Sequence, residues 1–188
     1  FQSEGPAWEP TPGRACLIAD PCAWLLSQSQ LMVSIWTKLW RRTSLGALHF
    51  DPVLFGSDDA LFTFSAFARF RKGLALLPGA YYFYRRHDGA VSVQAPPRYL
   101  FAQLRFLRKL PAVIPACYRR RLRKFLLKAF SDLVKALGDY RYDVATRRAV
   151  VRRIAALMRR NRLSYFAWTP KKFLRWRRCL RNCGLGNR

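Results

Sequence analysis

Long apolar runs are missing from this sequence. The longest, from Leu74 to Tyr84, is interrupted by Pro78 and Gly79 and is followed by two arginines. A helix that spans a membrane needs about 20 consecutive apolar residues, so no segment is predicted to cross a bilayer. The chain starts at Phe1, and its first residues lack the basic start and apolar run of a signal peptide. We therefore expect part of a longer, cytoplasmic chain.

Cysteine is present, but not in an arrangement typical of a site. The five cysteines include no C-x-x-C pair, and the usual ligand spacings of a structural zinc site are absent. An odd number of cysteines also argues against the closed disulfide framework of a secreted domain. We therefore expect reduced thiols, as in a cytoplasmic protein.

Acidic residues are scarce, and the shortage lies in one half of the chain. Residues 1–97 hold nine Lys/Arg and seven Asp/Glu, a net charge of +2, whereas residues 98–188 hold 26 and three, a net charge of +23. We predict two regions with this boundary. A field this positive attracts phosphates of nucleic acid, of anionic lipid headgroups or of nucleotide-linked substrates, so charge alone does not identify the partner.

Apolar and aromatic residues are plentiful, at 51% and 15% of the chain, which is ample for a packed core. In the first region we expect an irregular segment over 1–15 and one or two short helices between 20 and 42. A helix that Asp58 caps is predicted to run through Phe62, Phe67 and Phe70. Short strands are predicted over 74–77 and 80–84.

The second region has the apolar spacing of amphipathic helices. One is predicted to end before Pro111, a second to run from Tyr118 to a stop at Gly138, and a third to begin at Asp143. Thr169 and Pro170 read as the N-cap and first residue of a fourth helix. All four carry basic residues on their outer faces.

Two adjacent carboxylates, Asp58 and Asp59, interrupt an aromatic segment. Burying carboxylates without a partner is costly, so their presence indicates a function that involves a proton or a metal. The alternative is structural: one aspartate caps the helix and the other is solvated.

Four motifs occur in a defined order around this pair. They are W-x-K-L-W-R-R (36–42), F-D (50–51), the acidic pair followed by A-L-F (58–62), and Y-F-Y-R-R-H-D-G-x-V-S (82–92). Together they resemble the C-terminal part of the catalytic domain of family 2 glycosyltransferases, which have the GT-A fold. The resemblance covers residues 31–93. It implies an α/β fold with few strands, followed here by a mainly α-helical basic region.

The resemblance also implies an activity. Such enzymes transfer a sugar from a nucleotide-diphosphate sugar to an acceptor hydroxyl, use a divalent cation such as Mg²⁺ or Mn²⁺, and often build polysaccharide or lipid-linked glycans. The acidic pair, Asp58 and Asp59, would lie beside the acceptor, with Asp59 as general base. His87 matches the family's late histidine, which approaches the metal or the donor diphosphate.

Flanking residues complete the predicted site. Trp36, Lys38 and Trp40 match the acceptor side of the family, although they are equally typical of a core stripe with the lysine reaching solvent. Arg85 and Arg86 are candidates to bind the leaving diphosphate because guanidinium groups donate to phosphate oxygens. These two arginines and His87 are also compatible with an ordinary exposed loop.

The chain departs from the family in what it lacks. The first half of such a domain, with its nucleotide-binding loops and D-x-D metal motif, has no counterpart in this sequence. We therefore expect this chain to provide the acceptor side of the site and to be inactive alone.

The basic region permits a function of another class. Amphipathic helices with Lys/Arg on one face and Trp, Phe and Leu on the other bind anionic lipid, so residues 117–181 are predicted to hold the protein against the inner face of the cell membrane. Solvated helix faces are the structural alternative. Nucleic acid is a less favoured partner because no recognition module is evident. The competing hypothesis is a non-enzymatic basic module that binds membranes or nucleic acid.

Overall fold

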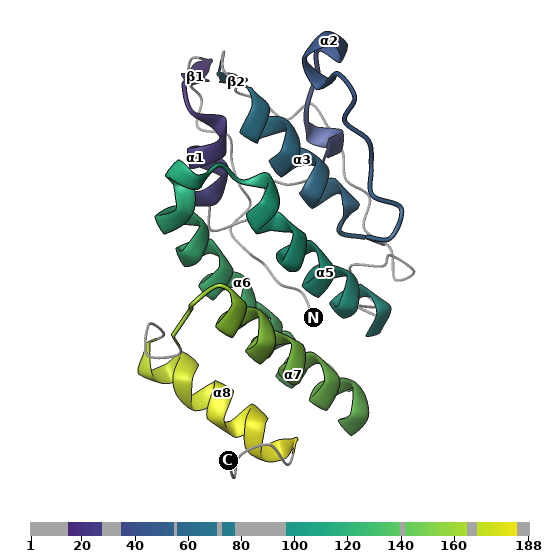
Figure 1. The fold of residues 1–188 in the computed structure, drawn as a ribbon, viewed down its shortest axis with the longest axis vertical. Coiled ribbons are helices and arrows are strands. Elements are labelled where there is room, and N and C mark those ends of the chain that lie inside the picture. Colours follow the sequence, from purple (N-terminus) through teal and green to yellow (C-terminus); the bar gives the residue numbers. More distant parts are fainter. Residues whose placement is uncertain are drawn as a thin grey trace.

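The computed structural model describes residues 15–27, 35–54, 56–70, 73–77, 97–139, 142–164 and 169–183. These ranges are mostly helical and include a small two-stranded sheet (Figure 1). The strands are β1 (Cys16–Ile18) and β2 (Leu74–Leu76), and the 3-10 helices are η1 (Ile35–Thr37) and η2 (Ala116–Tyr118). The α-helices are α1 (Pro21–Ser27), α2 (Arg42–Leu45), α3 (Asp58–Arg69), α5 (Pro97–Val113), α6 (Arg119–Asp139), α7 (Val144–Arg160) and α8 (Pro170–Asn182). The predicted helical C-terminal region is confirmed.

The sheet joins two segments that are far apart in the sequence. β1 and β2 are antiparallel, with Cys16 opposite Leu76 and Ile18 opposite Leu74. Gly73, just before β2, has a φ of +88°, and a Cβ atom there would lie 2.8 Å from the carbonyl oxygen of Ile18. Only glycine fits this backbone conformation and this close approach. β2 was predicted, whereas β1, with only three residues, has no pattern that the sequence reveals.

Helix α3 places both carboxylates in its first turn. The N-cap position belongs to Ser57, whose carbonyl accepts from the backbone of Leu61, so the prediction that Asp58 is the cap is wrong by one residue. Negative charge is favourable at a helix N-terminus, which is where Asp58 and Asp59 lie. The helix ends at Arg69, and the C-cap residue Phe70 has an extended backbone.

Helix α5 corrects a second expectation. It continues through Pro111 to Val113, although the sequence predicts an end before that proline. A proline in a helix interior removes one backbone hydrogen bond and crowds the preceding turn. In the last turn of α5 that disturbance is tolerated because the backbone bond from Ile114 to Leu110, at 3.1 Å, closes the helix end.

The last two helices begin as the sequence predicts. The side chain of Asp143 accepts a 2.8 Å hydrogen bond from the backbone of Thr146, which caps α7. Thr169 occupies the N-cap position of α8, with Pro170 as its first residue. The apolar side of α8 faces inward through Trp176, which is 2% exposed.

The hydrophobic core crosses the charge boundary at residue 97. Phe64 of α3 lies 5.9 Å from the ring of Phe106 in α5 and 5.2 Å from the ring of Phe125 in α6. In Figure 1, α5 and α6 lie between α3 above and α7 and α8 below. The buried residues of α1, α3 and α5–α8 form one contiguous cluster, so the near-neutral and basic regions stabilise each other.

In the described ranges, no helix is both long enough and apolar enough to cross a membrane.

Candidate functional site

The first motif of the sequence packs on the helix that carries the acidic pair. Trp40 lies against Phe62 and Phe67 of α3 and against Phe70, which follows the helix, with ring centroids 5.8 to 5.9 Å apart. Its indole nitrogen donates to the carbonyl oxygen of Ile35 at 3.4 Å, and the backbone of Lys38 donates to the same oxygen at 3.1 Å. Trp40 thus fixes η1 beside the first turns of α3.

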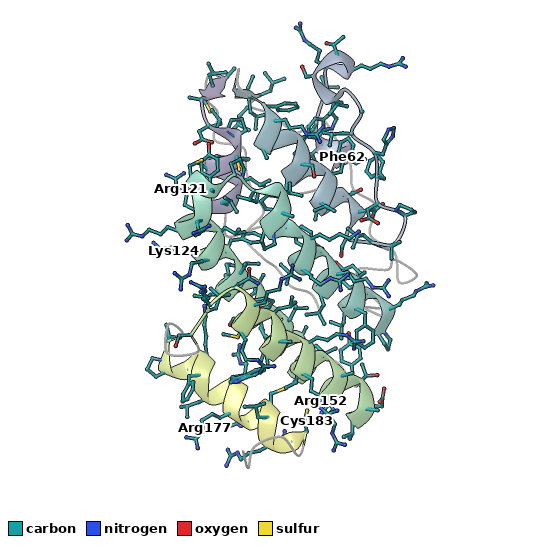
Figure 2. All side chains as sticks on the ribbon, viewed as in Figure 1. Phe62, Arg121, Lys124, Arg152, Arg177 and Cys183 are labelled. Carbon is teal, nitrogen blue, oxygen red and sulfur yellow. The ribbon has the colours of Figure 1, made fainter. Side chains whose placement is uncertain are left out.

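The second motif joins this site to the basic region. Phe50 stacks on Phe62 of α3 with the ring centroids 4.4 Å apart, and Figure 2 marks the position of Phe62. The neighbouring Asp51 forms an ion pair with Lys109 of α5. Hydrogen bonding to Lys109 lowers the pKa of Asp51 below its ordinary value, so Asp51 remains a carboxylate and anchors the loop before α3.

Asp59 occupies a different environment from Asp51. It is half-buried, and burial, followed by the charge of Asp58, raises its pKa above the ordinary value. A hydrogen bond from the backbone of Ile35 and the positive charge of Lys38 act in the opposite direction. The carboxylate of Asp59 therefore has a higher proton affinity than a solvated aspartate, while η1 holds it in place.

Lys38 is the cation of this site. Burial lowers its pKa from 10.5 to about 8, and only the charge of Asp59 opposes that shift. Its amino group donates to the hydroxyl of Thr37 at 3.1 Å. Lys38 and Asp59 are both half-buried and affect each other's protonation. The half-buried Lys38 is compatible with both predicted roles, the acceptor side and a core stripe with the lysine reaching solvent.

This arrangement is suited to proton transfer. A general base works best when its pKa lies closer to the working pH than that of a free carboxylate. Asp59 is shifted in that direction, and the neighbouring ammonium group of Lys38 stabilises its charged form. Asp58, the other member of the pair, raises the pKa of Asp59 through like-charge repulsion.

The structure describes only part of the predicted site. It brings together Asp58, Asp59, Lys38 and Trp40. Trp36 belongs to η1, but its side chain lies outside the described residues. The other predicted residues are also outside them; they are Arg85, Arg86 and His87.

A metal site was also predicted. Among the described residues, no three His, Cys, Asp or Glu side chains are grouped so that they could hold an ion. Asp58 and Asp59 alone do not form such a group, and His87 lies in the part of the chain that is not described. The divalent cation stays a prediction.

Two contributors to the site were not found in the sequence. The backbone N–H of Ile35 is one, and its role depends on η1 packing against α3. The other is Lys109, 58 residues from Asp51. A backbone donor has no sequence signal, and an ion pair across that separation becomes visible only once the helices are packed.

Comparison with known proteins does not extend these observations. No family model, no curated protein and no solved structure matches this chain.

Proposed function

We propose that this chain is the acceptor-side portion of a glycosyltransferase that resembles family 2 and its GT-A fold. It would take part in transfer of a sugar from a nucleotide-diphosphate sugar to a hydroxyl of a glycan or lipid-linked acceptor. Asp59 is the general base, and Asp58 and Lys38 set its proton affinity. Trp40 holds this group in position, and Trp36 belongs to the same acceptor-side segment.

One observation carries the proposal. Asp59 combines a half-buried carboxylate, a raised pKa and a hydrogen bond from Ile35 with a neighbouring ammonium group that comes from a separate motif. A carboxylate that only supports the helix N-terminus does not require a second packed segment beside it. Perturbed titratable groups of this kind concentrate at functional sites.

The proposed step is a displacement at the anomeric carbon. The acceptor oxygen forms a bond to the anomeric carbon, the bond from that carbon to the nucleotide diphosphate breaks, and the acceptor proton moves to the carboxylate of Asp59. A base within about 3 Å of the attacking hydroxyl is required. After the step Asp59 is neutral, and its partly buried surroundings favour that form.

The leaving diphosphate needs positive charge. Arg85, Arg86 and His87 remain the candidates to supply it, together with the Mg²⁺ or Mn²⁺ that the resemblance implies. The described residues do not assemble a site for that ion, so no part of the proposed step depends on it. The cytoplasmic location and the membrane or glycan partners belong to the same proposal.

Turnover of a donor tests the proposal. The full-length protein is incubated with a panel of nucleotide-diphosphate sugars, Mn²⁺ and a lipid extract as acceptor, and release of nucleoside diphosphate and labelled glycan are both measured. We expect Asp59→Asn to lower the transfer rate by about 10²- to 10⁴-fold, the usual contribution of a general base.

The control is Asp132→Asn, a matched change of an exposed aspartate on α6, which should retain the wild-type rate. Asp58→Asn should have a smaller effect than Asp59→Asn because Asp58 acts through its neighbour. A wild-type rate in the Asp59→Asn protein would contradict the assignment.

A second candidate function is a non-enzymatic basic module that binds an anionic membrane surface or, less favourably, nucleic acid. It is favoured by the exposed arginines on the outer faces of α7 and α8, among them Arg152 and Arg177 (Figure 2). The apolar face of α8 packs inward through Trp176, so attachment would be mainly electrostatic. Flotation with anionic vesicles tests this function. Equal recovery of the protein with the vesicles at low and at high salt would contradict it.

A further inference from the structure

A cleft lies between helices α1 and α6, on elements that the proposed site does not use. Its volume is about 710 Å³. Its lining includes residues from one face of each helix: Asp20, Ala23, Trp24, Leu26 and Ser27 at α1, and Arg121, Lys124, Phe125 and Lys128 on α6. Figure 2 shows Arg121 and Lys124 on the part of α6 that lies beside α1.

Three cations follow one stripe of this cleft. Arg121, Lys124 and Lys128 are spaced three and four residues apart, so they lie on the same face of α6. Lys128 is engaged by Asp132 at 2.7 Å. Arg121 and Lys124 are exposed and form no hydrogen bond or ion pair within the described part of the chain. Two cations at the cleft are therefore available to a ligand.

The acidic side chain of the cleft is already engaged. Asp20 accepts a hydrogen bond from the backbone of Ala23 at 2.9 Å and from the hydroxyl of Tyr118 at 3.0 Å. Burial and this bond to Asp20 raise the pKa of Tyr118 to about 12, so Tyr118 remains a donor. Asp20 thus secures the start of α1 and leaves Arg121 and Lys124 without a carboxylate partner.

Arginines in the first turn of α6 lower the stability of that helix. Helix α6 begins with Arg119, Arg120 and Arg121, and no acidic residue lies in its first turn. The N-terminus of a helix carries partial positive charge, so cations there lower its stability. A bound anion would relieve both the repulsion among the arginines and the unfavourable helix end.

The remaining surface of the cleft is apolar. Leu26 and Phe125 are each 5% exposed and form part of its base, with the half-buried ring of Trp24 beside them. A small inorganic anion would use the cations alone. A ligand with an apolar or planar group next to its charge would use both surfaces.

We propose that the α1–α6 cleft binds a phosphate ester, with the phosphate on Arg121 and Lys124 and an apolar or planar group against Trp24. The phosphate can belong to a soluble phosphorylated molecule or to a lipid headgroup, which present the same chemistry. This inference does not depend on the proposed glycosyl transfer.

Binding is measured with two probes on the whole chain. The soluble probe is uridine monophosphate, followed by calorimetry, and the lipid probe is phosphatidylcholine vesicles that contain phosphatidylglycerol, followed by sedimentation. The test variant is Arg121→Gln with Lys124→Gln. The control is Arg69→Gln with Arg108→Gln, which removes the same charge from two exposed arginines outside the cleft lining and outside α7 and α8.

We expect the test variant to lose at least about tenfold in affinity, since each charge-assisted bond to phosphate contributes more than a neutral one. The control should lose less than about threefold. Loss with uridine monophosphate supports a soluble ligand, and loss with vesicles alone supports a lipid headgroup. Equal losses in the two variants, or no binding of either probe, would overturn the proposal.

A variant of opposite sign provides a second test. Asp20→Asn keeps a side-chain oxygen for the helix cap but removes the negative charge of the cleft, so the affinity should rise. Thermal unfolding confirms that each variant is folded. An unchanged or lower affinity in folded Asp20→Asn would also overturn the proposal.

Discussion

The near-neutral region around α3 and the basic region from α6 to α8 use charge in different ways. Around α3 two acidic residues have defined cationic neighbours: Asp51 pairs with Lys109, and Asp59 interacts with the charge of Lys38. On α7 and α8 many arginines are exposed, and only the capping residue Asp143 is acidic. Both regions nevertheless contribute to one core.

This difference separates two kinds of recognition. Half-buried groups with shifted pKa values can move protons, because the surroundings control their charge. Exposed cations attract polyanions over a distance of about 8 to 10 Å at ordinary salt but leave specificity to local shape. We therefore propose proton chemistry at Asp59 and anion binding at the α1–α6 cleft, and the second candidate function adds anion binding at the outer basic faces.

The shared core gives the largest expected effect on stability. Phe64→Ala removes a fully buried ring that contacts both α5 and α6, and we expect a loss of about 3 to 5 kcal/mol. Urea unfolding followed by tryptophan fluorescence and by far-UV circular dichroism should give coincident transitions. Two separate transitions in the wild-type protein would show that the two regions fold independently, which would contradict a shared core.

Lys38→Met should act in the opposite direction. The pKa of Lys38 is about 8 in the folded protein and 10.5 in the unfolded chain, so its burial is unfavourable below pH 8 and the deficit disappears as the pH approaches 10.5. We expect the variant to be about 1 to 2 kcal/mol more stable than wild type at pH 7. This is less than the full pKa shift would give, because solvent partly screens the half-buried ammonium group.

Urea unfolding at pH 7 and pH 10 measures this difference, which should shrink at the higher pH. Lys124→Met, at an exposed position, is the control and should change little at either pH. A less stable Lys38→Met protein at pH 7 would mean that the attraction between Lys38 and Asp59 outweighs the cost of burying the ammonium group.

The ion pair between Asp51 and Lys109, which joins the two regions, should contribute less to stability. Asp51→Asn removes the ion pair with Lys109, whose side chain is 39% exposed, so solvent screens the interaction. We expect a loss of about 0.5 to 1 kcal/mol at pH 7. The pKa of Asp51 is lowered in the folded state, so this contribution is lost as the pH falls through that value, and the two proteins should converge in acid. Equal stability at pH 7 would show that the pair is not an anchor.

The outer cations should contribute least. Arg152→Gln with Arg177→Gln alters exposed side chains on α7 and α8, and the free energy of unfolding should change by no more than about 0.5 kcal/mol. Thermal unfolding at low and moderate salt measures this. A large loss would mean that these arginines stabilise the fold and are not simply available to partners.

Local patterns account for what the sequence predicted. The apolar spacing of α3 and α5–α8 and the capping side chain of Asp143 depend on neighbours within a few residues, so they are readable before folding. The acidic pair could be singled out for the same reason. The continuation of α5 through Pro111 was missed because a proline commonly ends a helix, and the backbone bond from Ile114 to Leu110 that closes this one cannot be read from the sequence.

The features that the sequence did not predict depend on contacts between residues far apart in the chain. β1 exists because it pairs with β2 more than 50 residues later. The environment of Asp59 depends on η1, which Trp40 holds against α3. The α1–α6 cleft arises from helices whose facing residues are about 100 positions apart. None of these follows from periodicity.

The proposed role of Asp59 as a general base depends on the pKa of its carboxyl group. Carbon-13 NMR of labelled aspartate, assigned by comparison with Asp59→Asn, gives the pKa of this carboxyl without any substrate. We predict a pKa above that of a solvated aspartate, and a further rise in Lys38→Met, because removal of the ammonium group removes a charge that lowers it. An ordinary pKa that Lys38→Met leaves unchanged would contradict the account.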